Sequence, residues 1–311
     1  MSLLPFDLPP GLLAFGDRDD TWQPWLAALP RLVRDVVEEW QLAYDGAPMH
    51  GQCALVVPVR TTGGTPAVVK FSWPHEEEEH EHVGLEALRG SGMVRLLRAD
   101  PRRHVLLLER LHAGEDLRAL PDDEACEVVA GLYRRIHIPA PAQLRPLTDF
   151  IARWADGLAA LPREAPVPHR LVEQAVSLSR DFVTEPKSVG TMIHGDLHYE
   201  NVLAGDREPW LAIDPKPMSG DPHYEVAPML WNRWDEAVAS GNVREAVRRR
   251  FFTLVDTAGL DEDRARDWVV VREVDNALWS IQDADRSRRS LGPEDREWIT
   301  RCIAIAKAVQ E

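Results

Sequence analysis

The chain has 311 residues, and 36 basic against 51 acidic side chains give it a formal net charge of −15. This negative balance argues against nucleic-acid binding, because phosphate backbones are held by Lys and Arg side chains. The content of 44% hydrophobic and 28% charged residues is typical of a globular protein and argues against disorder or a fibre. The charge is compatible with a cationic small molecule as a ligand.

The cysteines and the apolar runs indicate the compartment. Cys53, Cys126 and Cys302 lie far apart in the sequence and have no metal-site spacing, so they predict free thiols in a reducing compartment. No apolar run reaches the length of a membrane span, and no signal peptide is evident at the N-terminus. We therefore expect a cytoplasmic protein without a membrane partner, either a monomer or a homodimer.

The N-terminal part of the chain predicts one helix followed by a sheet. Apolar residues recur at three- and four-residue spacing from Trp22 to Trp40, which predicts an amphipathic helix. Four strands in two antiparallel hairpins are then expected at residues 53–59 with 67–71 and 93–97 with 104–108. Between the hairpins, the acidic run Glu76 to Glu81 leads into a helix. We expect this run to be mostly a solvated face, with at most one glutamate turned inward.

The remainder of the chain is mainly helical in pattern. Amphipathic helices are predicted near 122–137, 148–161 and 170–184, and a β-rich segment at 191–214 precedes further helices. This order predicts an α+β protein of two lobes. A small strand-rich lobe would comprise residues 1–110, and a larger, mostly helical lobe would comprise residues 111–311.

The most informative segment is His194-Gly195-Asp196-Leu197-His198-Tyr199-Glu200-Asn201. A predicted hairpin of residues 202–203 and 210–213 would return Asp214 to the neighbourhood of Asp196 and Asn201. Carboxylate and amide oxygens are ligands that Mg²⁺ prefers. The segment therefore predicts magnesium-dependent phosphoryl transfer. Asn201 and Asp214 would hold the metal, and Asp196 would orient the attacking hydroxyl and accept its proton.

The pattern H-G-D-L-H-x-x-N with a following I-D resembles the aminoglycoside phosphotransferase branch of the protein-kinase-like fold. Within this branch the chain is similar to the streptomycin 6-phosphotransferase group, the aminoglycoside/hydroxyurea resistance kinases. The segments that carry this similarity lie between about residues 45 and 285, at 92–97, 106–111, 212–217, 220–222, 230–233 and 277–280. The resemblance implies a bilobal kinase-like fold. It also implies Mg²⁺-dependent transfer of the γ-phosphoryl group of ATP to an aminoglycoside, most specifically to the 6-hydroxyl of streptomycin.

The same resemblance implies a nucleotide site in the small lobe. Lys70 matches the lysine that reaches the α- and β-phosphates. We choose Glu81 as its partner because Leu85 and Leu88 then lie on the helix face that packs on the sheet; Glu77 and Glu78 stay open as alternatives. Further nucleotide contacts are expected from Gly46 and His50 in a phosphate-covering segment at 46–52, and from Glu109 and Leu111 in a hinge that binds adenine.

The chain departs from the family pattern at two positions. Similar enzymes usually read His-Pro-Gly-Asn where this chain has Tyr199 and Glu200 between His198 and Asn201. We expect Tyr199 to narrow or reshape the acceptor side and Glu200 to add a carboxylate next to a metal ligand. Lys216 is expected to neutralise the moving phosphoryl group.

The acceptor site is predicted from aromatic and acidic residues of the helical lobe. Streptomycin carries two guanidino groups, and carboxylates bind guanidinium strongly, so the resemblance implies an acidic pocket. The candidate acceptor contacts are Trp231, Asn232, Asp235, Trp279 and Asp283.

Two other functions are compatible with these residues. One is a kinase of a housekeeping metabolite such as an amino alcohol or a sugar. The other is a catalytically silent nucleotide-binding module. The presence of Lys70, Asp196, Asn201 and Asp214 together disfavours the silent module. His194 is expected to brace the loop through hydrogen bonds rather than to bind a metal.

Overall fold

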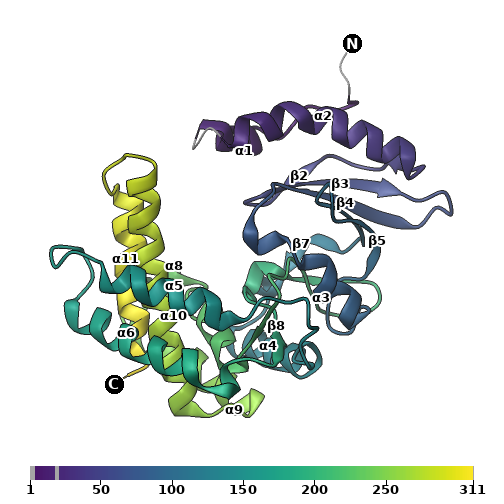
Figure 1. The fold of residues 1–311 in the computed structure, drawn as a ribbon. Coiled ribbons are helices and arrows are strands. Elements are labelled where there is room, and N and C mark those ends of the chain that lie inside the picture. Colours follow the sequence, from purple (N-terminus) through teal and green to yellow (C-terminus); the bar gives the residue numbers. More distant parts are fainter. Residues whose placement is uncertain (1–3, 18–20, 311) are drawn as a thin grey trace. The chain divides into compact units, whose positions relative to one another are not determined.

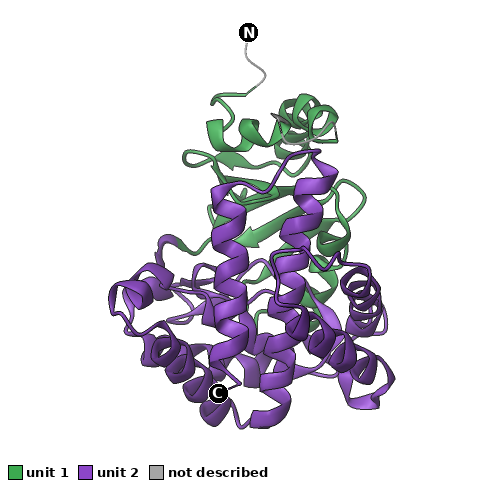
Figure 2. Cartoon of the chain, turned by 90° about the vertical axis from the view of Figure 1, so that its left-hand side faces the viewer, with its two compact units in different colours: residues 1–112 green, residues 113–311 purple. Residues whose placement is uncertain are grey.

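The computed structural model of the chain describes residues 4–17 and 21–310. The chain forms two compact units, Met1–His112 and Ala113–Glu311, which Figure 2 colours separately. The first is rich in strands and the second is mainly helical, as the α+β prediction requires. Among the described residues, no helix combines the length and apolar content needed to span a bilayer.

The first unit is built on a six-stranded antiparallel sheet (Figure 1). Its strands are β1 (Ala43–Tyr44), β2 (Met49–His50), β3 (Ala54–Arg60), β4 (Pro66–Ser72), β5 (Leu96–Asp100) and β6 (Val105–Glu109). The order is β1-β3-β4-β6-β5, and β2 pairs with the opposite end of β3 from β1. β5 begins at Leu96, later than the predicted residue 93, and Met93 and Val94 ahead of it are both buried.

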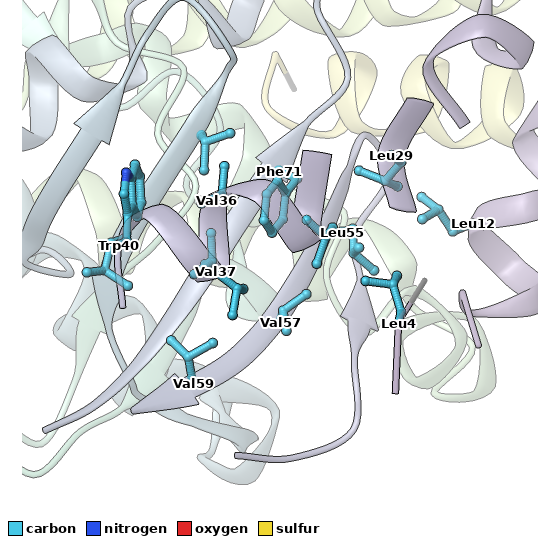
Figure 3. Packing of buried hydrophobic residues seen from close by; sticks show 14 of the residues in the cluster. Leu4, Leu12, Leu29, Val36, Val37, Trp40, Leu55, Val57, Val59 and Phe71 are labelled. Carbon is cyan, nitrogen blue, oxygen red and sulfur yellow. The ribbon is translucent and has the colours of Figure 1, made fainter. Parts of the chain in front are cut away.

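Helix α2 (Trp22–Glu39) lies along one face of this sheet, after the short α1 (Pro10–Leu13) and the 3₁₀ helix η1 (Ala14–Asp17) (Figure 1). Its apolar stripe includes Val36 and Val37, which pack in one cluster with Leu55, Val57 and Phe71 of the strands (Figure 3). Alternate residues of a strand face opposite sides. Because Phe71 faces α2, its neighbour in β4, residue 70, faces the other side of the sheet.

That other side carries the 3₁₀ helix η2 (Glu76–Glu78) and α3 (Glu81–Leu88). The acidic run from Glu76 to Glu81, which was predicted to lead into one helix, is therefore divided between two helical segments. Leu85 and Leu88 of α3 are buried, which accounts for the direction in which the helix presents its first turn.

The second unit contains helices around a core that surrounds α10 (Glu262–Arg286). The other helices are α4 (Asp122–Ile136), α5 (Leu147–Ala159), α6 (His169–Thr184), α7 (Ala227–Leu230), α8 (Trp234–Ala239), α9 (Val243–Ala258) and α11 (Pro293–Ala308). The predicted helices near 122–137, 148–161 and 170–184 correspond to α4, α5 and α6. In the core, Trp268 of α10 stacks on Phe182 of α6 with 3.9 Å between ring centroids.

Two small sheets hold the loops of this unit. One contains β10 (Leu211–Ala212), β9 (Val202–Ala204) and β7 (His112–Asp116) in that order, and the other pairs β8 (Thr191–Ile193) with β11 (Met218–Gly220). The pairing of Leu211 with Leu203 is the hairpin that the sequence predicts. The loop at residues 194–201 connects β8 to β9, and the segment at 213–217 connects β10 to β11.

Candidate active site

In the first unit, the Lys70 ammonium is held by two carboxylates. Lys70 is 6% exposed, and its Nζ lies 2.7 Å from Oε2 of Glu81 and 3.1 Å from Oε2 of Glu78. Ser72, which shares the face of β4 with Lys70, donates to Glu78 Oε2 at 3.0 Å. Lys70 thus pairs with Glu81, the chosen partner, and also with Glu78, an alternative. The expectation that at most one of these glutamates turns inward is wrong, because η2 and α3 each direct one glutamate at the same lysine.

The proposed phosphate-covering segment is a strand and a turn rather than one open loop. His50 lies in β2, and its ring packs against Phe15 at 6.2 Å between centroids. The Gly51 N–H donates to the carbonyl of Ala54 at 3.0 Å and forms the turn into β3. Gly46 has φ 153°, and a Cβ at this position would lie 3.2 Å from Cβ of Pro58. A side chain at position 46 would therefore be both strained and crowded.

The expected hinge residues lie at the end of β6. Glu109 exchanges two hydrogen bonds with Arg95: its N–H donates to the Arg95 carbonyl at 3.0 Å, and its Oε1 accepts from the Arg95 N–H at 2.8 Å. The following Arg110 pairs with Asp45 Oδ2 at 2.6 Å, and Leu111 is buried. These contacts hold the backbone of residues 109–111 to the sheet of the first unit.

In the second unit, the loop at 194–201 and the segment at 213–216 lie side by side. The Lys216 N–H donates to the His194 carbonyl at 2.8 Å, and the Ile213 N–H donates to the Asn201 carbonyl at 2.9 Å. The His194 ring joins them again, since its Nε2 lies 2.9 Å from the Ile213 carbonyl oxygen. Asp214 therefore lies in a segment that is hydrogen-bonded directly to both ends of the loop that carries Asp196 and Asn201.

The Asp196 carboxylate lies between two cationic side chains. Its Oδ2 is 2.8 Å from Nζ of Lys216, and its Oδ1 is 3.7 Å from Nη2 of Arg272. Burial of Asp196 disfavours its charged form, but Lys216, His198 and Arg272 outweigh burial, so the pKa of Asp196 lies below its ordinary value. Asp196 is therefore an ionised hydrogen-bond acceptor at neutral pH.

The amide of Asn201 is oriented by the same loop. Asn201 is 8% exposed, and its Nδ2 donates to the Asp196 carbonyl at 2.8 Å, which directs Oδ1 away from that carbonyl. Asp214 adopts a left-handed backbone conformation with φ 56°, which is uncommon for a residue other than glycine. An amide oxygen and a carboxylate are hard donors, so Asn201 and Asp214 fit a Mg²⁺ ion chemically.

Two buried residues that the sequence analysis did not single out support this loop. Glu225 is fully buried and accepts the N–H of His194 at 3.0 Å and that of Gly195 at 2.6 Å. Burial raises its pKa, but His137 and His194 outweigh burial and hold the pKa of Glu225 below its ordinary value. Arg272 donates through Nη1 to the Gly195 carbonyl at 2.8 Å. In the sequence, Arg272 could have been recognised as a charged residue inside an apolar run. Glu225 follows a family signature, but its neighbours in the sequence do not mark it as buried.

Tyr199 and Glu200 both make contacts with residues far away in the sequence. Tyr199 is fully buried, and its hydroxyl donates to Asp122 Oδ1 at 3.1 Å, so its side chain faces the interior of the second unit. Glu200 pairs with Nη1 of Arg118 at 2.7 Å on the surface. The local sequence did not reveal these directions, because the partners lie far away in the chain.

The candidate acceptor residues are dispersed in the second unit. Asn232 uses its amide for the backbone, donating to the Pro228 carbonyl and accepting from the Tyr199 N–H, which gives it a structural role. Trp231 packs edge-on against Trp298 at 5.7 Å. The remaining candidates are Trp279, which is 58% exposed, Asp235, which is exposed on α8, and Asp283, which pairs with Arg289 at 2.9 Å.

Known proteins resemble this chain over most of its length. Residues 39–284 match the family described as aminoglycoside/hydroxyurea antibiotic resistance kinase. Streptomycin 6-kinase of Streptomyces glaucescens is 44% identical over 87% of this chain and 88% of its own. Hydroxyurea phosphotransferase of Kitasatospora aureofaciens is 41% identical over 84% and 76%, respectively. Among solved structures, a thermostable aminoglycoside phosphotransferase with ADP and hygromycin B superposes with a TM-score of 0.60 at 17% identity, covering 89% of this chain and 98% of that one. This superposition confirms the predicted kinase-like fold.

Proposed function

The chain belongs to the aminoglycoside/hydroxyurea antibiotic resistance kinase family and is a phosphotransferase, and from this premise we propose that it phosphorylates the 6-hydroxyl of streptomycin with ATP and Mg²⁺. The choice of streptomycin is supported by the 44% identity to a streptomycin 6-kinase. The net charge of −15 is compatible with a cationic acceptor of this kind.

The observation that carries the proposal is the placement of the Asp196 carboxylate beside Lys216, on the loop that also carries Asn201. An ionised carboxylate lies on a braced loop, with one oxygen paired to Lys216. In the reaction, the acceptor hydroxyl donates its proton to Asp196 while its oxygen attacks the γ-phosphorus. The bond between that phosphorus and the β–γ bridging oxygen breaks, and ADP leaves. Since the pKa of Asp196 is low, its main contribution is to orient the hydroxyl, and the proton is transferred late.

The metal would be held by the Asn201 Oδ1 and the Asp214 carboxylate. These two side chains would hold Mg²⁺, whose charge would partly neutralise the nucleotide phosphates. The contribution of the chain is to hold Asn201 in place through the Asp196 carbonyl, and to hold Asp214 through the hydrogen bond between Ile213 and Asn201.

The nucleotide is assigned to residues of the first unit. Lys70 would bind the phosphates with its ammonium positioned by Glu81 and Glu78. Gly46 and His50 would cover the phosphates, and the backbone of Glu109 and Leu111 would bind adenine. For the acceptor, we keep Trp231, Asp235, Trp279 and Asp283 as candidate contacts.

Lys216 is assigned a second role besides its pair with Asp196, which is to neutralise charge on the transferred phosphoryl group. Lys216→Met should lower kcat about 100-fold at saturating substrates. It should also raise the pKa of Asp196, and with it the acid limb of the pH–rate profile. Unchanged turnover and an unchanged acid limb would contradict both assignments.

An ADP-release assay with Mg²⁺ across a panel of acceptors tests the proposed function. The panel contains streptomycin, hygromycin B, spectinomycin, hydroxyurea, choline and simple sugars. We expect turnover with streptomycin at a KM in the micromolar range. NMR of the product should then place one phosphoryl group on the 6-hydroxyl. A higher kcat/KM for an amino alcohol or a sugar would instead support a housekeeping kinase, and no acceptor-dependent ADP release would indicate a silent module.

A further inference from the structure

Tyr199 closes a ring of hydrogen bonds beneath the loop that carries Asp196 and Asn201. Its hydroxyl donates to Oδ1 of Asp122 at 3.1 Å, and Oδ2 of Asp122 accepts from Nε of Arg250 at 2.8 Å. Arg250 donates through Nη1 to the carbonyl of Asn232. The ring closes where Oδ1 of Asn232 accepts the backbone N–H of Tyr199 at 3.3 Å.

The ring joins four separate segments of the second unit. Tyr199 begins the 3₁₀ helix η5 (Tyr199–Asn201), Asp122 begins α4, Arg250 lies within α9, and Asn232 follows α7. Tyr199 is fully buried and Arg250 is 1% exposed. Hydrogen bonds between buried groups of opposite charge are costly to break, because the partner that stays behind is left uncompensated in a poorly solvated place.

The ring acts on Asn201 through the backbone of η5. Tyr199 is two residues before Asn201, its carbonyl accepts the N–H of Val202, and the Asn201 N–H donates to the His198 carbonyl at 3.0 Å. A side-chain bond and a backbone bond therefore hold Tyr199 from two directions. This restricts the rotation of the short turn that presents the Asn201 amide.

We propose that Tyr199 is a positioning residue for the metal ligand Asn201, acting through the Tyr199–Asp122–Arg250–Asn232 ring. The inference rests on the proposed function for the role of Asn201. It does not require Tyr199 to touch substrate, nucleotide or metal. It accounts for a fully buried tyrosine two residues before Asn201.

The test is Tyr199→Phe, which removes the hydroxyl and keeps the aromatic side chain and the backbone N–H. Loss of one hydrogen bond of ordinary strength predicts roughly three- to tenfold faster hydrogen exchange of the amides at 196–202. The dissociation constant for Mn²⁺, measured by electron paramagnetic resonance with ADP present, should rise by a similar factor. We also expect kcat to fall while the KM for the acceptor stays unchanged.

Trp268→Phe is the matched control. It removes the donor from Trp268 Nε1 to Oδ2 of the buried Asp221, which is also paired with an arginine, Arg264. The melting temperature should fall in this variant, while exchange in the loop and Mn²⁺ binding stay at the wild-type level. Equal losses in both variants would show a general effect on stability and would overturn the proposal, as would unchanged exchange and Mn²⁺ binding in Tyr199→Phe.

Two further variants keep the test decisive. If Tyr199→Phe does not fold, Asn232→Ala opens the ring at its other end and must produce the same changes in exchange and Mn²⁺ binding; normal values would overturn the proposal. Asn201→Ala separates the two proposals. Wild-type Mn²⁺ binding in that variant would refute the metal assignment of the proposed function, while hydrogen exchange in Tyr199→Phe would still decide whether the ring holds the loop.

Discussion

The two units hold their key charges in opposite ways. In the first unit a cation, Lys70, projects from a central strand and is held by the carboxylates of Glu78 and Glu81. In the second unit a carboxylate, Asp196, projects from a loop and is held by the cations Lys216 and Arg272. The backbone of Lys70 is already fixed by the sheet, since it is paired with Val56 and Leu106 on both sides.

The loop that carries Asp196 is not a strand of a sheet, and buried side chains form hydrogen bonds to its backbone instead. Glu225 binds two consecutive N–H groups of the loop, and Arg272 binds the carbonyl between them and Asp196. Because a sheet already satisfies its backbone groups, a site on a strand needs few additional partners. A site on a loop needs a buried polar group for each backbone group that the loop leaves unpaired.

The largest effect is expected at the carboxylate itself. Asp196→Asn should lower kcat by about 10² to 10⁴, because the amide cannot accept the proton of the acceptor hydroxyl. The dissociation constant of ADP, measured by calorimetry, should change less than twofold. Asp263→Asn, at a carboxylate 93% exposed on α10, is the control and should retain wild-type turnover. Wild-type turnover in Asp196→Asn would show that Asp196 is not the catalytic residue.

The second prediction tests the support of the loop. Glu225→Gln replaces one acceptor oxygen by an NH₂ group that faces a backbone N–H, so one buried donor loses its partner. We expect the free energy of unfolding in urea to fall by about 3 kcal/mol. A loss below about 1 kcal/mol would mean that the loop does not depend on this carboxylate.

Glu273 in α10 is a second fully buried glutamate and is the counterpart of Glu225. The same Glu→Gln substitution at this position should raise the free energy of unfolding instead of lowering it. Burial raises the pKa of the Glu273 carboxyl group to about 8, although Arg272, Cys302 and Asn276 act in the opposite direction. The folded state then binds a proton that the unfolded state releases above pH 4.5, so this group reduces stability as the pH rises from 4.5 to 8.

Glu273→Gln removes this titration. At pH 7 it should raise the free energy of unfolding by on the order of 2–3 kcal/mol, and the gain should vanish near pH 4. Urea unfolding at several pH values measures both. A variant that is less stable than the wild type at pH 7 would show that the Glu273 carboxylate is ionised and paired in the folded protein.

The smallest expected effect is the difference in ADP affinity between variants of the two glutamates that pair with Lys70. Glu81→Gln should weaken the binding of ADP about tenfold, and Glu78→Gln should weaken it less, because Glu81 makes the shorter bond to Nζ, at 2.7 Å against 3.1 Å. Calorimetric titration of both variants provides the comparison. The reverse order would assign Glu78 as the main partner of the lysine.

The sequence predicted those parts of the molecule whose signals are local. The helix from Trp22 to Trp40, the hairpin that returns Asp214 towards Asn201 and the strand that carries Lys70 follow from periodicity and turn residues. Contacts made by residues distant in sequence were not accessible in this way. Glu225 and the partners of Tyr199 become visible only when separate segments of the second unit are brought together. The apolar run around Arg272 marks this residue locally, but it does not reveal its contact with the Gly195 carbonyl. That Glu78 and Glu81 both turn inward was missed because η2 interrupts the helical phase ahead of α3.

Helix α2 has a practical consequence for work with shortened versions of the protein. The family match begins at residue 39, so the helix that covers the sheet of the first unit lies almost wholly before it. A truncation at that point would expose Leu55, Val57, Val59 and Phe71 to water. Such a contiguous apolar surface favours self-association. We expect the shortened chain to collect in inclusion bodies, and to become soluble again when the segment before residue 39 is restored.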